Sequence, residues 1–272
     1  MPVQLTPTLR EALAGTSRPL AGIWVCSGSP LVAEIVAGSG IDWLLIDQEH
    51  GPSQLESTLR QLQAVAAYPR HPRRACAVGR RGDDQAGARP WRAEPSRADG
   101  VLGGAGPRRR ARRALPAVRY PPRGVRGVGS ALARSARWNR VEDYLMNTDR
   151  YVSLFVQIET VDGVEAAAEI AATDGVDGVF VGPSDLAASM GLIGQQTHSD
   201  VTAAVRRAFE AVRSAGKPVG VNAFDPAVAQ SYLDAGATFV LVGADVALLA
   251  RSTEALAARY VPAANRDARP SY

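Results

Sequence analysis

The chain has 272 residues, of which 46% are hydrophobic, and a formal net charge of +4, which suits one large α/β domain with a substantial core. No apolar run reaches the roughly 18 residues that a membrane-crossing helix requires, and the first residues lack the pattern of a secretory signal. The two cysteines, Cys26 and Cys76, are too few for a disulfide framework and match no zinc spacing, so a reduced, cytoplasmic protein is predicted.

Short aliphatic strands alternate with helices along most of the chain. The elements predicted in the first part are a strand at 21–26, a helix at 30–38, a strand at 42–47 and a helix at 53–67 with a Ser cap. The elements predicted in the second part are an extended segment at 125–129, a short helix at 140–146, a strand at 151–157, a helix at 161–172, a strand at 178–181, helices at 185–190 and 200–215, a strand at 218–221, a helix at 226–235, a strand at 239–242 and a helix at 247–258. This alternation predicts an α/β fold with a buried parallel sheet, and the number of units favours a single (β/α)8 TIM barrel over residues 1–272.

Residues 73–116 interrupt the alternation. They hold 12 arginines and four acids, a local charge of +8 that leaves the rest of the chain mildly acidic. Only four large aliphatic residues occur in this block, too few to bury two barrel strands and two helices, so it is predicted to be disordered or mispacked. A basic arm that binds nucleic acid is the less favoured interpretation, because the arginine runs lack the interleaved aromatic residues used for base stacking.

Two compensating frameshifts explain the block better. The block can be back-translated with permitted, mostly GC-rich codons, and the resulting DNA can be read in the frame that starts one base later. The amino-acid sequence in that frame can contain a helix and an apolar strand at the positions where the barrel needs them. Several codons are permitted for most residues, so the back-translated sequence is not unique. The DNA sequence itself is therefore the test of the hypothesis.

Carboxylates follow two of the predicted strands, at the point where each strand ends. One strand runs into Glu159, and the next runs into Asp185, about one β-α-β step later. A third strand runs into Asp47 and His50. Side chains at the carboxyl ends of parallel strands converge on one edge of a barrel. Two carboxylates without a nearby soft ligand suit a hard divalent cation, and His50 is then the candidate proton carrier.

Several longer stretches of the chain resemble the HpcH/HpaI family of class II pyruvate aldolases. The matching stretches are 22–24, 42–50, 119–124, 126–134, 137–140, 156–160, 178–186 and 242–245. The resemblance spans nearly the whole chain except 73–116. It implies cleavage of 4-hydroxy-2-oxo acids, such as 4-hydroxy-2-oxoheptane-1,7-dioate, to pyruvate and an aldehyde. It also implies a homo-oligomer, a hexamer that exchanges C-terminal helices, with which the Ala/Leu-rich segment at 247–258 is compatible.

The resemblance assigns a role to each candidate site residue. Glu159 and Asp185 would hold Mg²⁺, Mn²⁺ or Co²⁺, which pyruvate would chelate through its carboxylate and keto oxygens. Gln157, Gly182 and the backbone around Ser184 would contact the substrate.

His50 would be the base that takes the proton of the 4-hydroxyl, and Asp47 would in part orient it. General chemistry supports these roles independently of the resemblance. Breaking the C3–C4 bond leaves a pyruvate enolate, whose charge a metal stabilises, and a histidine exchanges protons near neutral pH.

Two groups that the family places in its site are absent from the chain as written. An arginine against the keto oxygen and a carboxylate that makes the histidine more basic fall at about positions 75 and 89 of the shifted frame, where the sequence has Ala75 and Arg89. Loss of such an oxyanion-stabilising donor typically costs about 10²–10³ in rate.

Other interpretations stay open. An aldolase for deoxy-sugar keto acids such as 2-dehydro-3-deoxyglucarate is the alternative within the same class, and a frame-damaged, inactive relative is the alternative outside it. Instead of binding a metal, Glu159 and Asp185 could be acids placed at helix N-termini, where the helix dipole favours a negative charge. A Schiff-base mechanism is disfavoured, because the sole lysine, Lys217, precedes a predicted strand and does not follow one.

Overall fold

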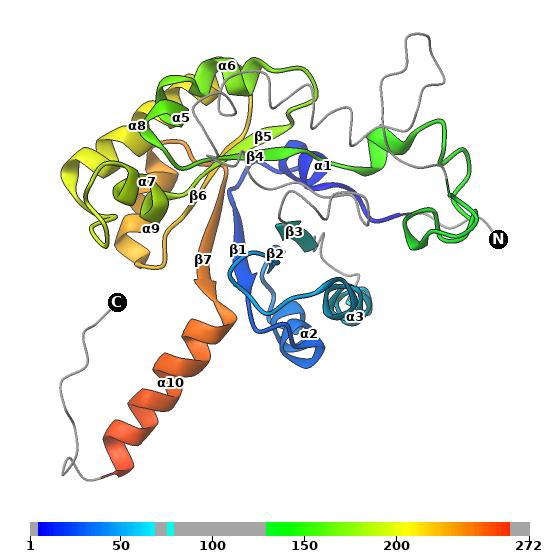
Figure 1. Ribbon diagram of the computed structural model, residues 1–272, viewed down its shortest axis with the longest axis horizontal. Coiled ribbons are helices and arrows are strands. Elements are labelled where there is room, and N and C mark those ends of the chain that lie inside the picture. The colour runs from blue at the N-terminus through cyan, green and yellow to red at the C-terminus, as the bar shows by residue number, and fades with distance from the viewer. Residues whose placement is uncertain (1–4, 69–74, 79–128, 262–272) are drawn as a thin grey trace.

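A computed structural model describes residues 5–68, 75–78 and 129–261, and for 75–78 it describes the backbone alone (Figure 1). Seven strands form one sheet in the order β3-β2-β1-β7-β6-β5-β4. Their bounds are β1 (Leu20–Val25), β2 (Trp43–Asp47), β3 (Ala75–Val78), β4 (Phe155–Ile158), β5 (Gly178–Val181), β6 (Val219–Asn222) and β7 (Phe239–Ala244). Every pairing between neighbours is parallel. The predicted α/β class with a parallel sheet is confirmed.

The strand order is that of consecutive strands in a barrel. Neighbours in the sheet are neighbours in the sequence, except that β1 pairs with β7 and thereby joins the two ends of the described chain. Within the described residues β3 and β4 are the two edges of a curved, open sheet.

The described residues form nine α-helices. Their bounds are α1 (Leu9–Ala14), α2 (Pro30–Gly38), α3 (Leu55–Val65), α5 (Val161–Glu165), α6 (Ala167–Ala172), α7 (Pro183–Ser189), α8 (Ser199–Ser214), α9 (Pro226–Asp234) and α10 (Asp245–Tyr260). Helices α2, α3 and α5 to α9 pack on the outer face of this sheet, Leu9 of α1 packs with the inner aromatic cluster, and α10 extends away. Side-chain caps start several of them: Ser29 accepts from the N–H of Val32 at α2, and Asp225 from that of Val228 at α9. Across 5–68, 75–78 and 129–261, no helix combines the length and apolar character that a membrane crossing requires.

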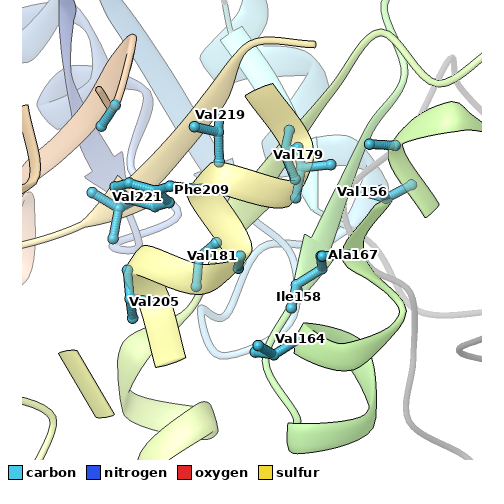
Figure 2. Close-up of a cluster of buried hydrophobic side chains, with 14 of the residues drawn as sticks. Val156, Ile158, Val164, Ala167, Val179, Val181, Val205, Phe209, Val219 and Val221 are labelled. Atoms are coloured by element: carbon cyan, nitrogen blue, oxygen red, sulfur yellow. The ribbon is translucent and has the colours of Figure 1, made fainter. Parts of the chain in front are cut away.

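The outer core forms because alternate residues of each strand point away from the concave side. Figure 2 shows these outward aliphatic side chains against α5, α6 and α8. The strand residues are Val156, Ile158, Val179, Val181, Val219 and Val221, and the helix residues are Val164, Ala167, Val205 and Phe209. A similar cluster joins β1 and β2 to α2 and α3.

Aromatic rings fill the concave side of the sheet near the amino ends of the strands. Each ring lies opposite a glycine of the neighbouring strand: Trp43 opposite Gly22, Phe155 opposite Gly178, and Phe239 opposite Gly220. A Cβ at any of these glycines would collide with the ring. The rings also touch one another, with centroids 5.3 Å apart for Phe155 and Phe239 and 5.7 Å apart for Trp43 and Phe239. This layer closes one end of the interior, so polar groups gather at the other.

The helix predicted over 140–146 is wrong. These residues form turns between two short 3-10 helices, η2 (Arg134–Ala136) and η3 (Thr148–Tyr151). Within this range Asp143 has a φ of 51°, in the left-handed region, which a continuous right-handed helix cannot contain.

Two other predicted helices differ in extent. The helix predicted over 161–172 is interrupted at Ala166, which has φ −85° and ψ 5° and separates α5 from α6. The helix predicted from Ser53 begins at Leu55, and Ser53 is not its cap, since its hydroxyl oxygen accepts from the Gln61 amide at 3.4 Å.

Strand β3 lies inside the block 73–116, whose composition predicts no strand. Its residues pair with β2 from Leu44 opposite Ala75 to Asp47 opposite Val78. The rest of that block, and most of the extended segment predicted at 125–129, lie outside the described residues.

Candidate active site

A pocket of about 210 Å³ opens at the carboxyl ends of the strands. It is lined by Trp24, Cys26, Asp47, Glu49, His50, Gln157, Phe180, Gly182, Pro183, Ser184, Asp185, Asn222, Phe224 and Ala244. Every candidate site residue predicted from the sequence except Glu159 therefore lies in its wall. Parallel strands bring these side chains together because all of them end at the same edge.

Glu159 lies directly behind this wall. It is only 4% exposed, and its Oε2 accepts a hydrogen bond of 2.7 Å from Gln157 Nε2. Gly182, on the neighbouring strand end, leaves room for both groups. A Cβ at Gly182 would lie 2.9 Å from Gln157 Nε2 and 3.7 Å from Glu159 Oε2. Its φ of −101° and ψ of 93° suit any residue, so the requirement for glycine here is one of space.

Asp185 belongs to the first turn of α7, after Pro183 and Ser184. Both Ser184 and Asp185 are exposed at the pocket rim. A carboxylate is favoured in a first helical turn by the helix dipole, and that preference alone would account for an acid at this position. Asp185 also lies in the pocket wall, just beyond the end of β5, the strand that neighbours β4, so its carboxylate could serve as a second donor beside Glu159.

Asp47 holds the turn that carries His50. This carboxylate is 2% exposed, and its Oδ1 accepts from the backbone N–H groups of Glu49 at 2.7 Å and His50 at 3.2 Å. The sequence-based expectation was that Asp47 orients the histidine, and the contact found is with the backbone of His50. The His50 side chain is exposed and faces the pocket.

Several wall residues are not among the predicted site residues, and three of them, Trp24, Cys26 and Asn222, form polar contacts in the wall. Trp24 Nε1 donates to Asn222 Oδ1 at 2.9 Å, which ties the end of β1 to the end of β6. Cys26 Sγ lies 3.7 Å from Asp47 Oδ2. Burial, with smaller contributions from Asp47 and Asp245, raises the pKa of the Cys26 thiol from 9.0 to about 12. The sequence signal that could have found Trp24 is its place in the family-like stretch 22–24.

The residues present fit a hard divalent cation. Glu159 and Asp185 could supply carboxylate oxygens to such an ion, since Mg²⁺-type sites commonly use one or two carboxylates with water and substrate oxygens. Over the part of the chain that the structure describes, no group of three or more His, Cys, Asp or Glu residues forms a complete cage.

Comparison with known proteins identifies the relatives of this chain. The family model of HpcH/HpaI aldolase/citrate lyase matches residues 20–75 and 107–252. A hydroxypyruvate/pyruvate aldolase of Deinococcus radiodurans is 44% identical over 280 residues, which cover 99% of this chain and 96% of that protein. A 4-hydroxy-2-oxo-heptane-1,7-dioate aldolase of Salmonella dublin is 43% identical over 252 residues, which cover 89% of this chain and 90% of that protein.

A solved structure supports the same family. The crystal structure of an HpcH/HpaI aldolase/citrate lyase family protein from Burkholderia cenocepacia superposes with a TM-score of 0.82 at 35% identity, covering 92% of this chain and 98% of that one. With the family model matching well over half of the sequence, the chain belongs to the HpcH/HpaI aldolase/citrate lyase family.

Proposed function

We propose that this protein is a metal-dependent pyruvate aldolase that cleaves 4-hydroxy-2-oxo acids, such as 4-hydroxy-2-oxoheptane-1,7-dioate, to pyruvate and an aldehyde. One observation carries the proposal. His50, Gln157 and Asp185 line one pocket, with Glu159 bonded to Gln157 behind it. The membership of an aldolase family, with two aldolases at 43% and 44% identity, supports the same reaction.

Each residue has a defined task in this proposal. Glu159 and Asp185 would hold the divalent metal, Mg²⁺, Mn²⁺ or Co²⁺. When bound, such an ion polarises the keto oxygen and stabilises the negative charge that develops as the C3–C4 bond breaks. Gln157, held by its bond to Glu159, and the backbone around Ser184 contact the 2-oxo acid.

His50 removes the proton of the 4-hydroxyl group, so that the departing carbon leaves as an aldehyde. An imidazole suits this step because it exchanges protons near neutral pH. Asp47 serves the step indirectly, since it holds the backbone of the turn from which the imidazole reaches the pocket.

The position of the lysine argues against a Schiff base. Lys217 is the sole lysine of the sequence, and its Nζ donates to the carbonyl oxygen of Val176 at 2.8 Å. It precedes β6 and so lies at the opposite end of the strands from the pocket. A covalent imine would require a lysine within reach of the keto carbon.

Pyruvate release, followed through lactate dehydrogenase and NADH, tests the proposal. We expect EDTA to abolish activity, and Mg²⁺, Mn²⁺ or Co²⁺ to restore it. Glu159→Gln and Asp185→Asn should lose activity and weaken metal binding measured by calorimetry, whereas Glu169→Gln, an exposed acid on α6, should change neither. Full activity in a metal-free sample would contradict the proposal. The cleavage rates of 4-hydroxy-2-oxoheptane-1,7-dioate and 2-dehydro-3-deoxyglucarate, measured side by side, decide which of the two substrates is preferred.

We also propose that the complete fold is a closed (β/α)8 barrel and that residues 73–116 derive from two compensating frameshifts. The family model leaves residues 76–106 unmatched, inside this block. Resequencing codons 70 to 118 is the test. If resequencing removes an insertion–deletion pair and restores the shifted reading frame, the missing arginine and carboxylate return and an active aldolase is expected. If the DNA sequence stands as written, little or no activity is expected.

The C-terminal helix supports a homo-oligomer, and we propose a hexamer with exchanged C-terminal helices. Helix α10 extends away from the sheet (Figure 1), and Asp245 is its one buried residue. Several of its apolar side chains are exposed, namely Val246, Leu248, Leu249, Leu256 and Tyr260. Light scattering on the purified protein measures the state directly, and Leu249→Glu combined with Leu256→Glu should reduce the measured mass.

A further inference from the structure

Asp245 connects the root of α10 to the loop that follows β1. Its side chain is buried, and its two oxygens accept three backbone N–H groups. Oδ1 accepts from Cys26 at 2.8 Å and from Val246 at 2.8 Å, and Oδ2 accepts from Ser27 at 3.1 Å. A helix-capping acid bonds only the N–H groups of its own helix. Asp245 instead bonds two consecutive N–H groups of a loop from the other end of the chain.

The loop that Asp245 holds is in contact with the turn that carries His50. A Cβ at Gly51, the residue after His50, would lie 2.7 Å from the Cys26 carbonyl oxygen and 3.0 Å from that of Asp47. The backbones of the two loops therefore meet at Gly51. Only a glycine permits this approach.

A second route runs through side chains. Cys26 Sγ lies 3.7 Å from Asp47 Oδ2, with the thiol as the donor. The other oxygen of the same carboxylate accepts the N–H groups of Glu49 and His50. The thiol is protonated because burial and the carboxylates around it raise the pKa of Cys26 to about 12, so it can donate throughout the neutral range.

We infer that Asp245 is a positioning residue of the active site, which sets the place of His50 by fixing Cys26 and Ser27. The inference rests on the proposed function in that His50 is the base. Asp245 does not line the pocket, and its carboxylate is occupied by backbone N–H groups, so it acts through the two loops and not on the substrate. A small shift of a positioned base has a large effect, since a displacement of about 1 Å can cost on the order of 10²-fold in rate.

The test compares Asp245→Ala and Asp245→Asn with a matched control, Asp42→Asn. Asp42 is also a buried carboxylate that accepts a backbone N–H of β1, from Ala21 at 3.0 Å, but at the opposite end of that strand. Hydrogen exchange followed by mass spectrometry reports on the loops directly. We expect faster exchange at 26–27 and at 49–50 in Asp245→Ala, and no change at 49–50 in Asp42→Asn.

Kinetics supply the second readout. In Asp245→Ala, kcat for aldol cleavage should fall about 10- to 100-fold with KM nearly unchanged, because the base is displaced and not the metal or the 2-oxo acid site. Asp245→Asn, which keeps an oxygen acceptor, should recover part of the loss. Decarboxylation of oxaloacetate gives the same enolate with no hydroxyl proton to remove, so its rate should stay close to that of the unmodified protein.

Gly51→Ala probes the same contact without touching α10 and should reproduce the fall in kcat. The inference is overturned if Asp245→Ala lowers the melting temperature but leaves exchange at 49–50 and kcat unchanged. Absence of aldol cleavage in the unmodified protein would instead refute the proposed function. The exchange measurement would still decide whether Asp245 holds the His50 turn.

Discussion

Replacing Gly182 by alanine should impair the site without disturbing the fold. The added Cβ would lie 2.9 Å from Gln157 Nε2, closer than carbon atoms approach such a group, so the amide must move. That amide is held by its 2.7 Å bond to Glu159, which would lengthen or break. A hydrogen bond to a charged group contributes about 1.5–3 kcal/mol. If the bond serves the transition state, its loss corresponds to a decrease in kcat/KM of about 10- to 150-fold.

The backbone adds little to this effect, because the φ of −101° at Gly182 suits alanine. Steady-state pyruvate release, metal titration and thermal melting would be measured on Gly182→Ala and on Gly38→Ala, where a Cβ would meet nothing closer than 3.8 Å. The double variant with Gln157→Ala is decisive. If Gly182→Ala acts by displacing the amide, its effect should disappear once the amide is removed. A Gly182→Ala protein within twofold of the unmodified kcat/KM would refute the reasoning.

Three further predictions concern Cys26 in the pocket wall and the inner aromatic layer. Because the pKa of Cys26 is raised from 9.0 to about 12, its alkylation by iodoacetamide, followed by peptide mapping, should be slow at pH 8 and rise about tenfold per pH unit above it; a rate equal to that of a free thiol would contradict this. The same shift predicts a stability contribution that is present below pH 9.0 and is lost as the pH rises toward about 12, since only the unfolded chain then ionises readily. Gly220→Ala should overpack the ring of Phe239, at a cost of about 1–3 kcal/mol, and lower the melting temperature by roughly 2–12 °C. An unchanged melting temperature would show that the inner rings can rearrange.

Local sequence was sufficient to predict most strands and to predict that polar side chains gather at the carboxyl ends of those strands. The prediction for β5 agrees at both ends, 178–181, because a short apolar run bounded by Gly and Pro has few alternatives. The grouping of Asp47, His50, Gln157 and Asp185 in one pocket follows from parallel geometry alone, since every strand ends at the same edge. The family was also evident from the sequence, because long motifs in a fixed order are seldom accidental.

Tertiary structure decided the features whose partners lie far apart in the chain. The left-handed conformation of Asp143 interrupts the predicted helix over 140–146, where the chain forms turns. Each inner ring faces a glycine of another strand, and nothing near either residue in the sequence announces the pair. Asp245 reads as a helix-capping acid until it is seen to bind the backbone of Cys26. Periodicity and spacing determine which face of an element is buried, but only the folded chain determines which distant groups meet, because that depends on packing of all the elements together.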